Sequence, residues 1–329
     1  MDYKLVLKSI WEKSKLSFFL SFFSVSALFL KGFLILPFRL VPAALRNKLH
    51  DMASEAYKPA PTERAEFEFA ARQALGIFAM DNEALLQEAF PGFDGYHVGE
   101  MRHVRYTLIT DRQAGTYHIA IRGSENEHNW IDNFTPEFEW DKELKATLHK
   151  GYRAIALELL EGLMPLVENR DYSIIVSGGS LGGAVSVAVG WYLDSRGYSV
   201  RQIYNFAGPR LTDDDYSHLK VLTVVNKLDA IWMLPLATPL HRYRHQGKRI
   251  VIIPSKDYKE NRGAAEWRIY EDSLLSDLLL SSWGIDRKLD TAEHTAYGTY
   301  FQHFLESGAV SDNVEGDNLQ VAETAEVSA

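Results

Sequence analysis

The segment from Gly178 to Gly182 has the spacing of a catalytic nucleophile turn. It reads Gly-Gly-Ser-Leu-Gly, which fits the pattern Gly-x-Ser-x-Gly with Ser180 at its centre. A buried strand is expected just before it, at residues 172–177, and a helix of small residues just after it, at residues 184–193. Glycines two residues before and after the serine allow the strand to turn sharply into the helix. This context predicts that Ser180 is a nucleophile, and an inert serine in a glycine-rich turn is the alternative.

A nucleophilic serine needs a base, and the base needs an acid that orients it. Where a strand and a helix are joined by this kind of turn, the order along the chain is serine, acid, histidine. Asp229 follows the strand expected at residues 220–225, at the edge where ligands gather in open α/β sheets. His294 lies in a late loop, and His303 is the alternative base. The sequence therefore predicts Ser180, Asp229 and His294 as the catalytic set.

The elements that must position these side chains alternate between strands and helices. We expect strands at residues 106–110, 116–121, 172–177, 200–206, 220–225 and 249–253, and helices at residues 67–86, 152–168 and 184–193. Such alternation predicts an α/β fold, with a mostly parallel sheet covered by helices.

The composition excludes several function classes. The 329 residues are 46% hydrophobic and 24% charged, which is typical of a globular protein. The formal net charge of −9 argues against nucleic acid as a partner. Because the chain contains no cysteine, it has no disulfides, thiolate nucleophile or cysteine-ligated zinc. We expect neither a metal nor another cofactor.

Charge and hydropathy divide the chain into four parts. Residues 1–50 are apolar and basic, residues 51–66 are a polar linker, residues 67–304 form the catalytic domain, and residues 305–329 are an acidic, disordered tail. Residues 16–30 carry no charge, and an apolar run resumes at residues 32–38. An N-terminal apolar helix there fits a membrane anchor or in-plane membrane helix, a secretory signal, or a buried core helix. The first two interpretations predict membrane association or export.

Six motifs follow one another along residues 67–304. They are Arg122-Gly123-Ser124 with Asn129-Trp130-Ile131-Asp132, His149-Lys150-Gly151-Tyr152, Gly178–Gly183, Phe206–Arg210, Val225-Asn226 with Asp229, and His294 with Tyr297. Together they resemble the class 3 lipases, which are fungal-lipase-like α/β hydrolases.

The resemblance implies the α/β-hydrolase fold and a triad of Ser180, Asp229 and His294. It also implies an oxyanion hole formed by Ser124 and the backbone N–H of Leu181. A short lid would follow the oxyanion residue at about residues 125–134, and it would include Asn129, Trp130 and Ile131.

The chain departs from the family pattern beside the active site. Gly179 stands where a histidine is usual, which removes a side chain next to the nucleophile and would widen the turn. Ile121 replaces a usual phenylalanine before Arg122. After the acid, residues 230–235 (AIWMLP) form a longer apolar stretch, which fits either a wall of the acyl site or core packing.

For four further features, two histidines, one tryptophan and one apolar run, a structural role is weighed against a functional role. His149 and His245 are expected to be structural hydrogen-bonding residues. Trp267 and the run at residues 274–283, which ends at Trp283, fit an amphipathic helix better than a second membrane-contacting surface.

These features predict a serine carboxylic-ester hydrolase that acts on lipids at a membrane, with a lipid substrate and a membrane surface as its partners. Membrane phospholipids or partial glycerides are the expected substrates, because the N-terminal segment would hold the enzyme on a bilayer. A non-catalytic membrane or partner-binding protein on a hydrolase scaffold is the alternative, motivated by Gly179. A lipase effector delivered by a secretion system is a third possibility.

Overall fold

The computed structural model describes residues 43–101, 104–123, 137–229, 231–235, 243, 245–254, 265–273, 276 and 279–280. Several parts of the sequence predictions lie outside the described residues. They are the N-terminal apolar segment, Ser124, the expected lid (Asn129, Trp130 and Ile131), Trp283, the predicted base His294, its alternative His303 and the acidic tail.

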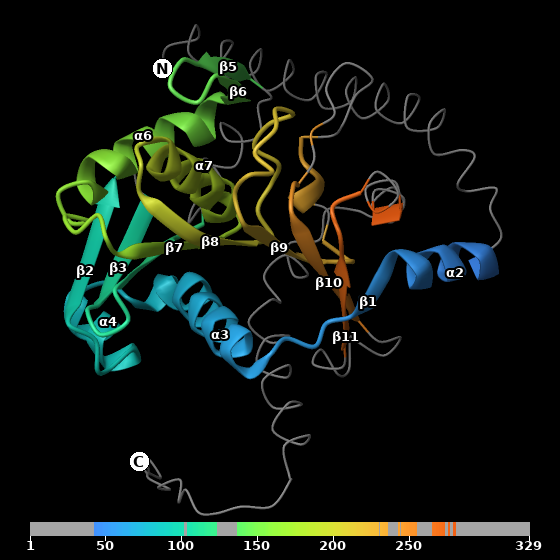
Figure 1. The fold of residues 1–329 in the computed structure, drawn as a ribbon, viewed down its shortest axis with the longest axis horizontal. Helices are drawn as coiled ribbons and strands as arrows, with labels where there is room; N and C mark the ends of the chain where they lie inside the picture. The colour runs from blue at the N-terminus through green and yellow to red at the C-terminus, as the bar shows by residue number, and fades with distance from the viewer. Residues whose placement is uncertain are drawn as a thin grey trace, which may run out of the picture.

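One large sheet organises the described part of the chain (Figure 1). Its nine strands have the order β1-β11-β10-β9-β8-β7-β4-β3-β2. The five central strands, from β10 to β4, pair in parallel, and the outer strands pair antiparallel. The strands are β1 (Ser54–Ala56), β2 (Gly95–Met101), β3 (Val104–Asp111), β4 (Thr116–Ile121), β7 (Ser173–Gly179), β8 (Ser199–Phe206), β9 (Val221–Asn226), β10 (Lys248–Pro254) and β11 (Ala265–Tyr270). The expected mostly parallel sheet is confirmed.

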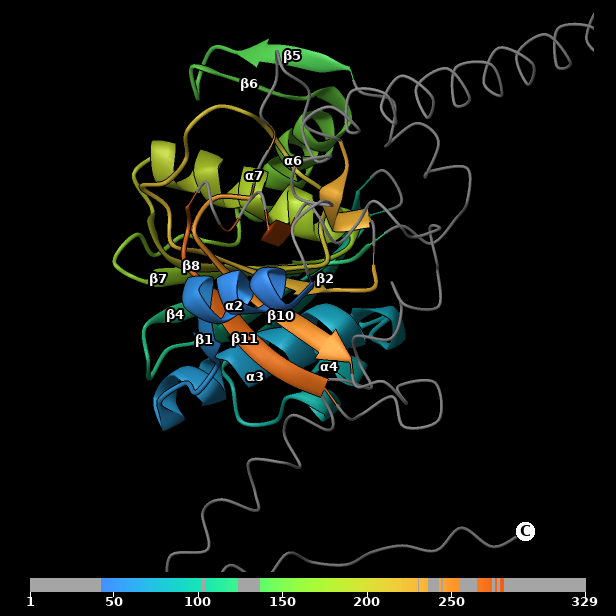
Figure 2. The ribbon, with the colours of Figure 1, turned by 90° about the vertical axis from the view of Figure 1, so that its right-hand side faces the viewer.

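Helices cover both faces of this sheet, as the two ribbon views show (Figures 1 and 2). The helices α6 (Lys150–Leu163) and α7 (Leu181–Ser195) lie on one face, and α3 (Pro61–Gly76) lies on the other. With both faces covered, the central strands are almost continuously apolar, as parallel strands usually are. Six of the seven residues of β7 are buried, for example.

The helix expected at residues 67–86 is divided into three pieces. α3 ends at Gly76, and a short 3-10 turn, η1 (Ile77–Ala79), follows it. α4 (Glu83–Ala89) then begins with Asn82 as its N-cap, whose side chain accepts a hydrogen bond from the Leu85 N–H at 3.0 Å. Because such a cap satisfies a free N–H group at a helix start, it favours a new helix over continuation of α3.

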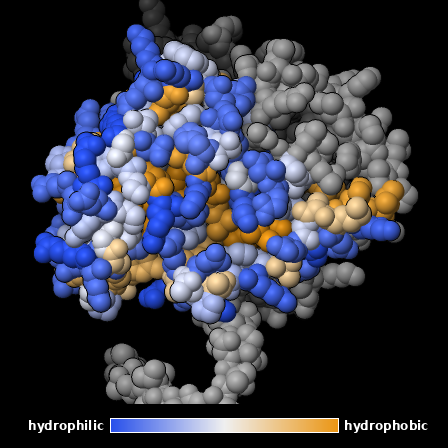
Figure 3. Space-filling model, in the orientation of Figure 1, coloured by the Kyte–Doolittle hydropathy of each residue, from blue (hydrophilic) through white to orange (hydrophobic). Residues whose placement is uncertain are grey.

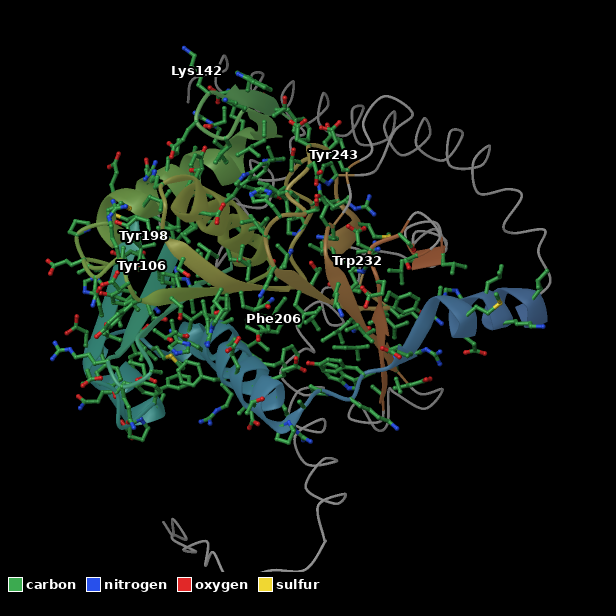
Figure 4. The ribbon with its side chains drawn as sticks, viewed as in Figure 1. Tyr106, Lys142, Tyr198, Phe206, Trp232 and Tyr243 are labelled. Carbon is green, nitrogen blue, oxygen red and sulfur yellow. The ribbon has the colours of Figure 1, made fainter. Side chains whose placement is uncertain are left out.

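The side of the sheet that faces α3 has an aromatic core. The Phe67 ring lies 5.8 Å from Tyr204, 5.9 Å from Phe206 and 6.5 Å from Trp267, measured between ring centroids. Figure 4 shows Phe206 between the sheet and α3. Trp267 is 8% exposed, so it packs in the core and is not part of a membrane-contacting surface. Leu279 and Leu280, from the apolar run expected at 274–283, are also buried.

The polar segment at 51–66, which we expected to be a linker, instead contributes to the fold. Its residues Ser54–Ala56 form strand β1, which pairs with β11 at the edge of the sheet. The Arg268 side chain donates hydrogen bonds to the Ser54 hydroxyl and carbonyl at 2.7 and 3.1 Å. An edge strand is open to solvent on one side, so its polar composition does not distinguish it from a linker.

The helix α2 (Ala43–Ala53) presents apolar side chains to solvent. Leu45 is 48% exposed and Met52 is 72% exposed, and Figure 3 shows apolar side chains gathered on α2. The helix is held to the sheet by a 3.2 Å hydrogen bond between His50 Nδ1 and the Tyr270 hydroxyl. Among the described residues, we find no helix that is both long and apolar enough to cross a membrane.

A hairpin lies outside the α6–α7 layer (Figure 2). It consists of β5 (Phe138–Asp141) and β6 (Ala146–His149). The buried Asp141 carboxylate accepts hydrogen bonds from the Tyr192 hydroxyl at 2.6 Å and from Arg153 Nε at 2.8 Å. These bonds fix the hairpin on the two helices, whereas its Trp140 side chain stays 56% exposed.

Two histidines, the buried His245 and the partly buried His118, make the stability of the fold depend on pH. Burial lowers the pKa of His118, which packs on Phe69, from about 6.5 to about 4, and burial lowers the pKa of His245 to about 3. The unfolded chain therefore takes up these protons at a higher pH than the native chain does. The stabilisation is complete above pH 6.5 and decreases as the pH falls toward 4, by up to about 3 kcal/mol for His118.

We therefore expect the free energy of unfolding to decrease between pH 6.5 and pH 4, and to decrease less in a His118→Leu variant. Urea titrations at pH 7, 5.5 and 4.5 would measure this difference. Equal pH dependence in both proteins would contradict a neutral, buried His118.

Candidate active site

The nucleophile turn is formed as the sequence predicts. β7 ends at Gly179, Ser180 follows, and α7 begins at Leu181. Ser180 has φ 54° and ψ −125°, which are strained angles for a residue other than glycine. Its backbone N–H donates to the Phe206 carbonyl at 2.8 Å, and its own carbonyl accepts from the Gly183 N–H at 2.9 Å. The turn therefore holds Ser180 at the start of α7, where helix N–H groups favour negative charge.

Glycine is required at two positions of this turn because backbone atoms approach closely. A Cβ atom at Gly178 would lie 2.1 Å from the Gly182 carbonyl oxygen, which is far inside van der Waals contact. A Cβ atom at Gly182 would lie 2.1 Å from the Ile121 carbonyl oxygen at the end of β4. These contacts pack the first turn of α7 against both β7 and β4. They explain the spacing of the Gly-x-Ser-x-Gly pattern in this chain.

A second close contact fixes α7 to the end of β8. The Asn205 Oδ1 atom accepts a hydrogen bond from the Gly208 N–H at 2.9 Å. A Cβ atom at Gly183 or at Gly208 would lie 2.2 Å from the same oxygen. The motif Phe206–Arg210 therefore has a structural role, because it lets the chain pass beside the start of α7. Asn205 is buried and was not identified from the sequence.

The predicted acid lies in a tight turn directly after β9. Asp229 is 2% exposed, and its Oδ1 atom accepts a hydrogen bond from the Ile231 N–H at 2.8 Å. Its backbone N–H donates to the Asn226 carbonyl at 3.0 Å, and Asn226 Oδ1 accepts from the Leu228 N–H at 2.9 Å. Both side chains hold the turn, so the orientation of the carboxylate is fixed. A buried, oriented carboxylate is what a triad acid requires.

The sheet brings the predicted nucleophile, Ser180, and the predicted acid, Asp229, to the same edge. Gly179 pairs with Phe206, and Phe206 pairs with Val224, so β7, β8 and β9 end side by side. Two strand spacings, roughly 9.5 Å, separate β7 from β9. An imidazole hydrogen-bonded through both nitrogens spans roughly 8 Å between its two oxygen partners. The strand spacing is therefore of the size that a histidine between Ser180 and Asp229 would need.

The predicted oxyanion residues approach Ser180 from two directions. Leu181 is the first residue of α7, so its N–H group is among those without a partner inside the helix. A Cβ atom at Gly123 would lie 2.9 Å from the Gly179 carbonyl oxygen and 3.2 Å from Ser180 Cβ. The chain thus reaches the nucleophile at Gly123, directly before the predicted residue Ser124.

The space beside Gly179 is filled from another element. The Cβ position of Gly179 lies 3.5 Å from Leu75 Cδ2 and 3.9 Å from the Ala74 carbonyl oxygen of α3. The absence of a side chain at residue 179 therefore does not leave the turn wider, because α3 packs against it. The small residue Gly179 was the only sequence signal for this contact.

The apolar stretch after the acid belongs to the core. Ile231, Trp232 and Met233 form the turn η2 and are at most 3% exposed. Trp232 and Met233 pack with β9, β10 and β11 in one apolar cluster. His245 is buried, and its Nε2 atom lies 2.7 Å from the Trp232 carbonyl oxygen. Because a carbonyl oxygen can only accept, the proton of the ring lies on Nε2, which donates to Trp232, and the predicted structural role is supported.

His149 also lies where packing explains it. It precedes α6, is 2% exposed and stacks on Tyr152 with a centroid distance of 4.0 Å. On its other side, the Phe138 ring of the hairpin meets it edge-on and stacks on Tyr243, which Figure 4 labels. His149 therefore joins the hairpin to α6.

Substitution of the adjacent residues Gly178 and Gly179 by alanine should change the free energy of unfolding very differently. Gly178→Ala forces a Cβ atom against the backbone of α7, and we expect a loss of more than about 3 kcal/mol in the free energy of unfolding. Gly179→Ala meets only ordinary contacts, and we expect a change below about 1 kcal/mol. Urea denaturation of both variants measures the difference. Equal destabilisation would show that the turn is not packed as described.

Comparison with known proteins finds a similarity to one family. Residues 118–238 match the family model described as lipase (class 3). A secreted mono- and diacylglycerol lipase of Fusarium solani is 27% identical over 130 residues, which are 38% of this chain. The match spans only 39% of the length of that relative. Both findings confirm the resemblance seen in the motifs.

Solved structures agree with the fold. The triacylglyceride lipase of Rhizomucor miehei has a TM-score of 0.55 at 18% identity, over 73% of this chain and 96% of its own. Lipase II of Rhizopus niveus has a TM-score of 0.51 at 17% identity, over 67% of this chain and 89% of its own. The expected α/β-hydrolase fold is confirmed.

Proposed function

We propose that this relative of the class 3 lipases hydrolyses carboxylic esters of lipids, with Ser180 as its nucleophile. One observation carries the proposal. Ser180 is held at strained backbone angles at the start of α7, on the sheet edge where the buried Asp229 also lies. Backbone strain of this kind is concentrated at functional sites, and a sharp turn between strand and helix suits a nucleophile that must project from the fold.

In this proposal His294 is the base that lies between Ser180 and Asp229. It takes the Ser180 hydroxyl proton as the oxygen attacks the ester carbonyl, and then gives the proton to the departing alcohol. Asp229 keeps the imidazole in the tautomer that accepts from serine. Water then hydrolyses the acyl-enzyme with the same base and releases the fatty acid.

The negative charge of the tetrahedral intermediate would be held by the Leu181 N–H and by Ser124. The Leu181 N–H belongs to the first turn of α7, whose dipole adds to the stabilisation. Ser124 follows Gly123, which contacts the nucleophile turn. Residues 129–131 would belong to a lid with an apolar face, which opens where lipid replaces water.

Partial glycerides or membrane phospholipids are the substrates that we propose. The name of the Fusarium relative supports mono- and diacylglycerols. The apolar, basic N-terminal segment supports a substrate that is presented by a membrane, and it would hold the enzyme there.

Fatty-acid release from diacylglycerol emulsions, triacylglycerol emulsions and phospholipid vesicles tests the proposal, with Ser180→Ala as the blank. Release by the wild type alone would establish the hydrolase, and the preferred emulsion or vesicle would identify the lipid class. No release from any of the three by the folded wild type would favour the non-catalytic, binding-protein alternative.

A further inference from the structure

The helix α2 carries a stripe of apolar side chains that faces solvent (Figure 3). Leu45, Leu49 and Met52 are spaced by four and then three residues, so they lie on one face of the helix. Leu45 is 48% exposed, Met52 is 72% exposed, and Leu49 between them is partly exposed. A stripe of this kind on a helix usually faces the core of its protein. The packing of the fold therefore does not explain it.

A different face of α2 holds the helix to the sheet. The Nδ1 atom of the buried His50 lies 3.2 Å from the Tyr270 hydroxyl of β11, and the His50 carbonyl accepts a hydrogen bond from the Ser54 hydroxyl at 2.6 Å. Ala53 packs against the apolar cluster that contains Trp232. The helix is thus fixed through His50 and Ala53, and the stripe of Leu45, Leu49 and Met52 is left on another face.

The charges around the stripe suit a surface of anionic lipids. Lys48 is exposed and lies four residues before Met52, so the two are neighbours on the helix surface. Asp51 is the acid of α2, and its carboxylate lies 3.3 Å from Arg268 Nη1, so its charge is paired. Residues 1–42, which precede α2, contain six Lys or Arg and two acids. Each basic side chain near an anionic bilayer contributes about 1 kcal/mol of attraction.

The length of the preceding connection keeps α2 close to any membrane that holds the N-terminal segment. The apolar run at residues 32–38 ends five residue steps before Ala43, where α2 begins. Five steps span at most about 18 Å when the chain is fully extended. If the run lies in a bilayer, the start of α2 is held near the lipid headgroups. Burial of its apolar stripe among them is then favoured by the hydrophobic effect.

We propose that α2 is an interfacial helix, whose stripe of Leu45, Leu49 and Met52 inserts into the surface of an anionic bilayer. This inference rests on the proposed function for the membrane contact of the N-terminal segment, and it adds a contact made by the folded domain. A single tether would leave the domain free to rotate. A second contact that is fixed to β11 sets the orientation of the sheet, and the end of β7 lies four strand spacings away, roughly 19 Å. The contact therefore holds Ser180 at one orientation toward the lipid.

The test uses a fluorescent label on α2. Because the chain contains no cysteine, one introduced cysteine gives a single site of attachment. Leu45→Cys and Met52→Cys, each in the full chain, carry a nitrobenzoxadiazole label, whose emission rises when it leaves water. With vesicles of phosphatidylglycerol and phosphatidylcholine, we expect emission at both positions to rise severalfold. A nitroxide high on the lipid acyl chain should quench both labels more than one near the chain end, since an interfacial helix lies roughly 5–10 Å deep.

Leu85→Cys with the same label is the matched control. Leu85 is 39% exposed and lies on α4, which packs beside β2 at the opposite edge of the sheet. Its label should stay in water, so its emission should not change when vesicles are added. A rise at residue 85 equal to that at residues 45 and 52 would mean that the label itself enters the bilayer, and it would overturn the inference.

Three further results would also overturn it. Unchanged emission at residues 45 and 52, while the chain sediments with the vesicles, would mean that the N-terminal segment binds alone. High emission before vesicles are added, with no change afterwards, would mean that another segment of this chain covers the stripe. If the chain does not sediment with the vesicles, the membrane contact fails as a whole. Fatty-acid release from emulsions then decides separately whether the proposed hydrolase activity stands.

Discussion

Ser180→Ala should lower kcat for lipid ester hydrolysis by about 10⁶-fold, because no other group can form the acyl-enzyme. The variant keeps the Cβ atom, and the backbone bonds of Ser180 to Phe206 and Gly183 do not involve the hydroxyl. Alanine also tolerates φ 54° no worse than serine does. We therefore expect a folded protein whose melting temperature stays close to that of the wild type. Titration of released fatty acid with both purified proteins measures the loss.

Ser177→Ala is the matched control for this substitution. Ser177 lies on β7 three residues earlier, is 1% exposed, and donates a 3.3 Å hydrogen bond to the Ile119 carbonyl. Loss of this hydroxyl should lower the free energy of unfolding only slightly, since this weak bond contributes about 1 kcal/mol. We expect kcat to stay within about threefold of the wild type. Activity in Ser180→Ala within a hundredfold of the wild type would show that another residue is the nucleophile.

The central strands and the mostly parallel sheet could be predicted because burial on both faces leaves a clear mark in the sequence. β7 contains the buried apolar run Ile174-Ile175-Val176 and ends in a glycine turn, and the structure places it among the five central parallel strands. β4 agrees with the expected residues 116–121. Parallel strands need crossovers, so each such strand also predicts a neighbouring helix.

The edges of the sheet could not be predicted in the same way. β1 has three residues, of which two are exposed, and it looks like a linker until its pairing with β11 is known. The hairpin β5–β6 is held on α6 and α7 by the bonds of Asp141 to Arg153 and Tyr192. Such a contact joins residues that neither hydropathy nor periodicity relates to each other.

At the candidate site, too, some features could be predicted from the sequence and others could not. The positions of Ser180 and Asp229 at strand ends could be predicted, because strand ends at the carboxyl edge of a parallel sheet converge, and the chain order predicts their roles. The contact of Leu75 with Gly179 could not be predicted, because α3 precedes the turn by about a hundred residues in the chain. The sequence shows only that residue 179 is small, and the fold shows which side chain occupies the space.

Asp229→Asn should lower kcat by about 10⁴-fold while the fold stays intact. The amide oxygen of asparagine can still accept from the Ile231 N–H, so the turn after β9 should keep its geometry. The amide group, however, can donate to the base and so stabilise the wrong imidazole tautomer, and it carries no charge to stabilise the imidazolium ion. We expect a fall in kcat with little change in KM, because the acid does not contact the lipid. Initial rates over a range of substrate concentrations separate the two parameters.

Asp214→Asn distinguishes this effect from the simple loss of a carboxylate. Like Asp229, Asp214 accepts a hydrogen bond from a backbone N–H through its carboxylate, in this case from Thr147. Unlike Asp229, it joins the β5–β6 hairpin to the loop after β8. Removing its charge should leave kcat within about threefold of the wild type, because no reacting group depends on it. A loss below tenfold in Asp229→Asn would place the triad acid elsewhere. A 10⁴-fold loss there with a near-normal Asp214→Asn would mean that catalysis needs the carboxylate of Asp229 itself, as a triad with a histidine between Asp229 and Ser180 requires.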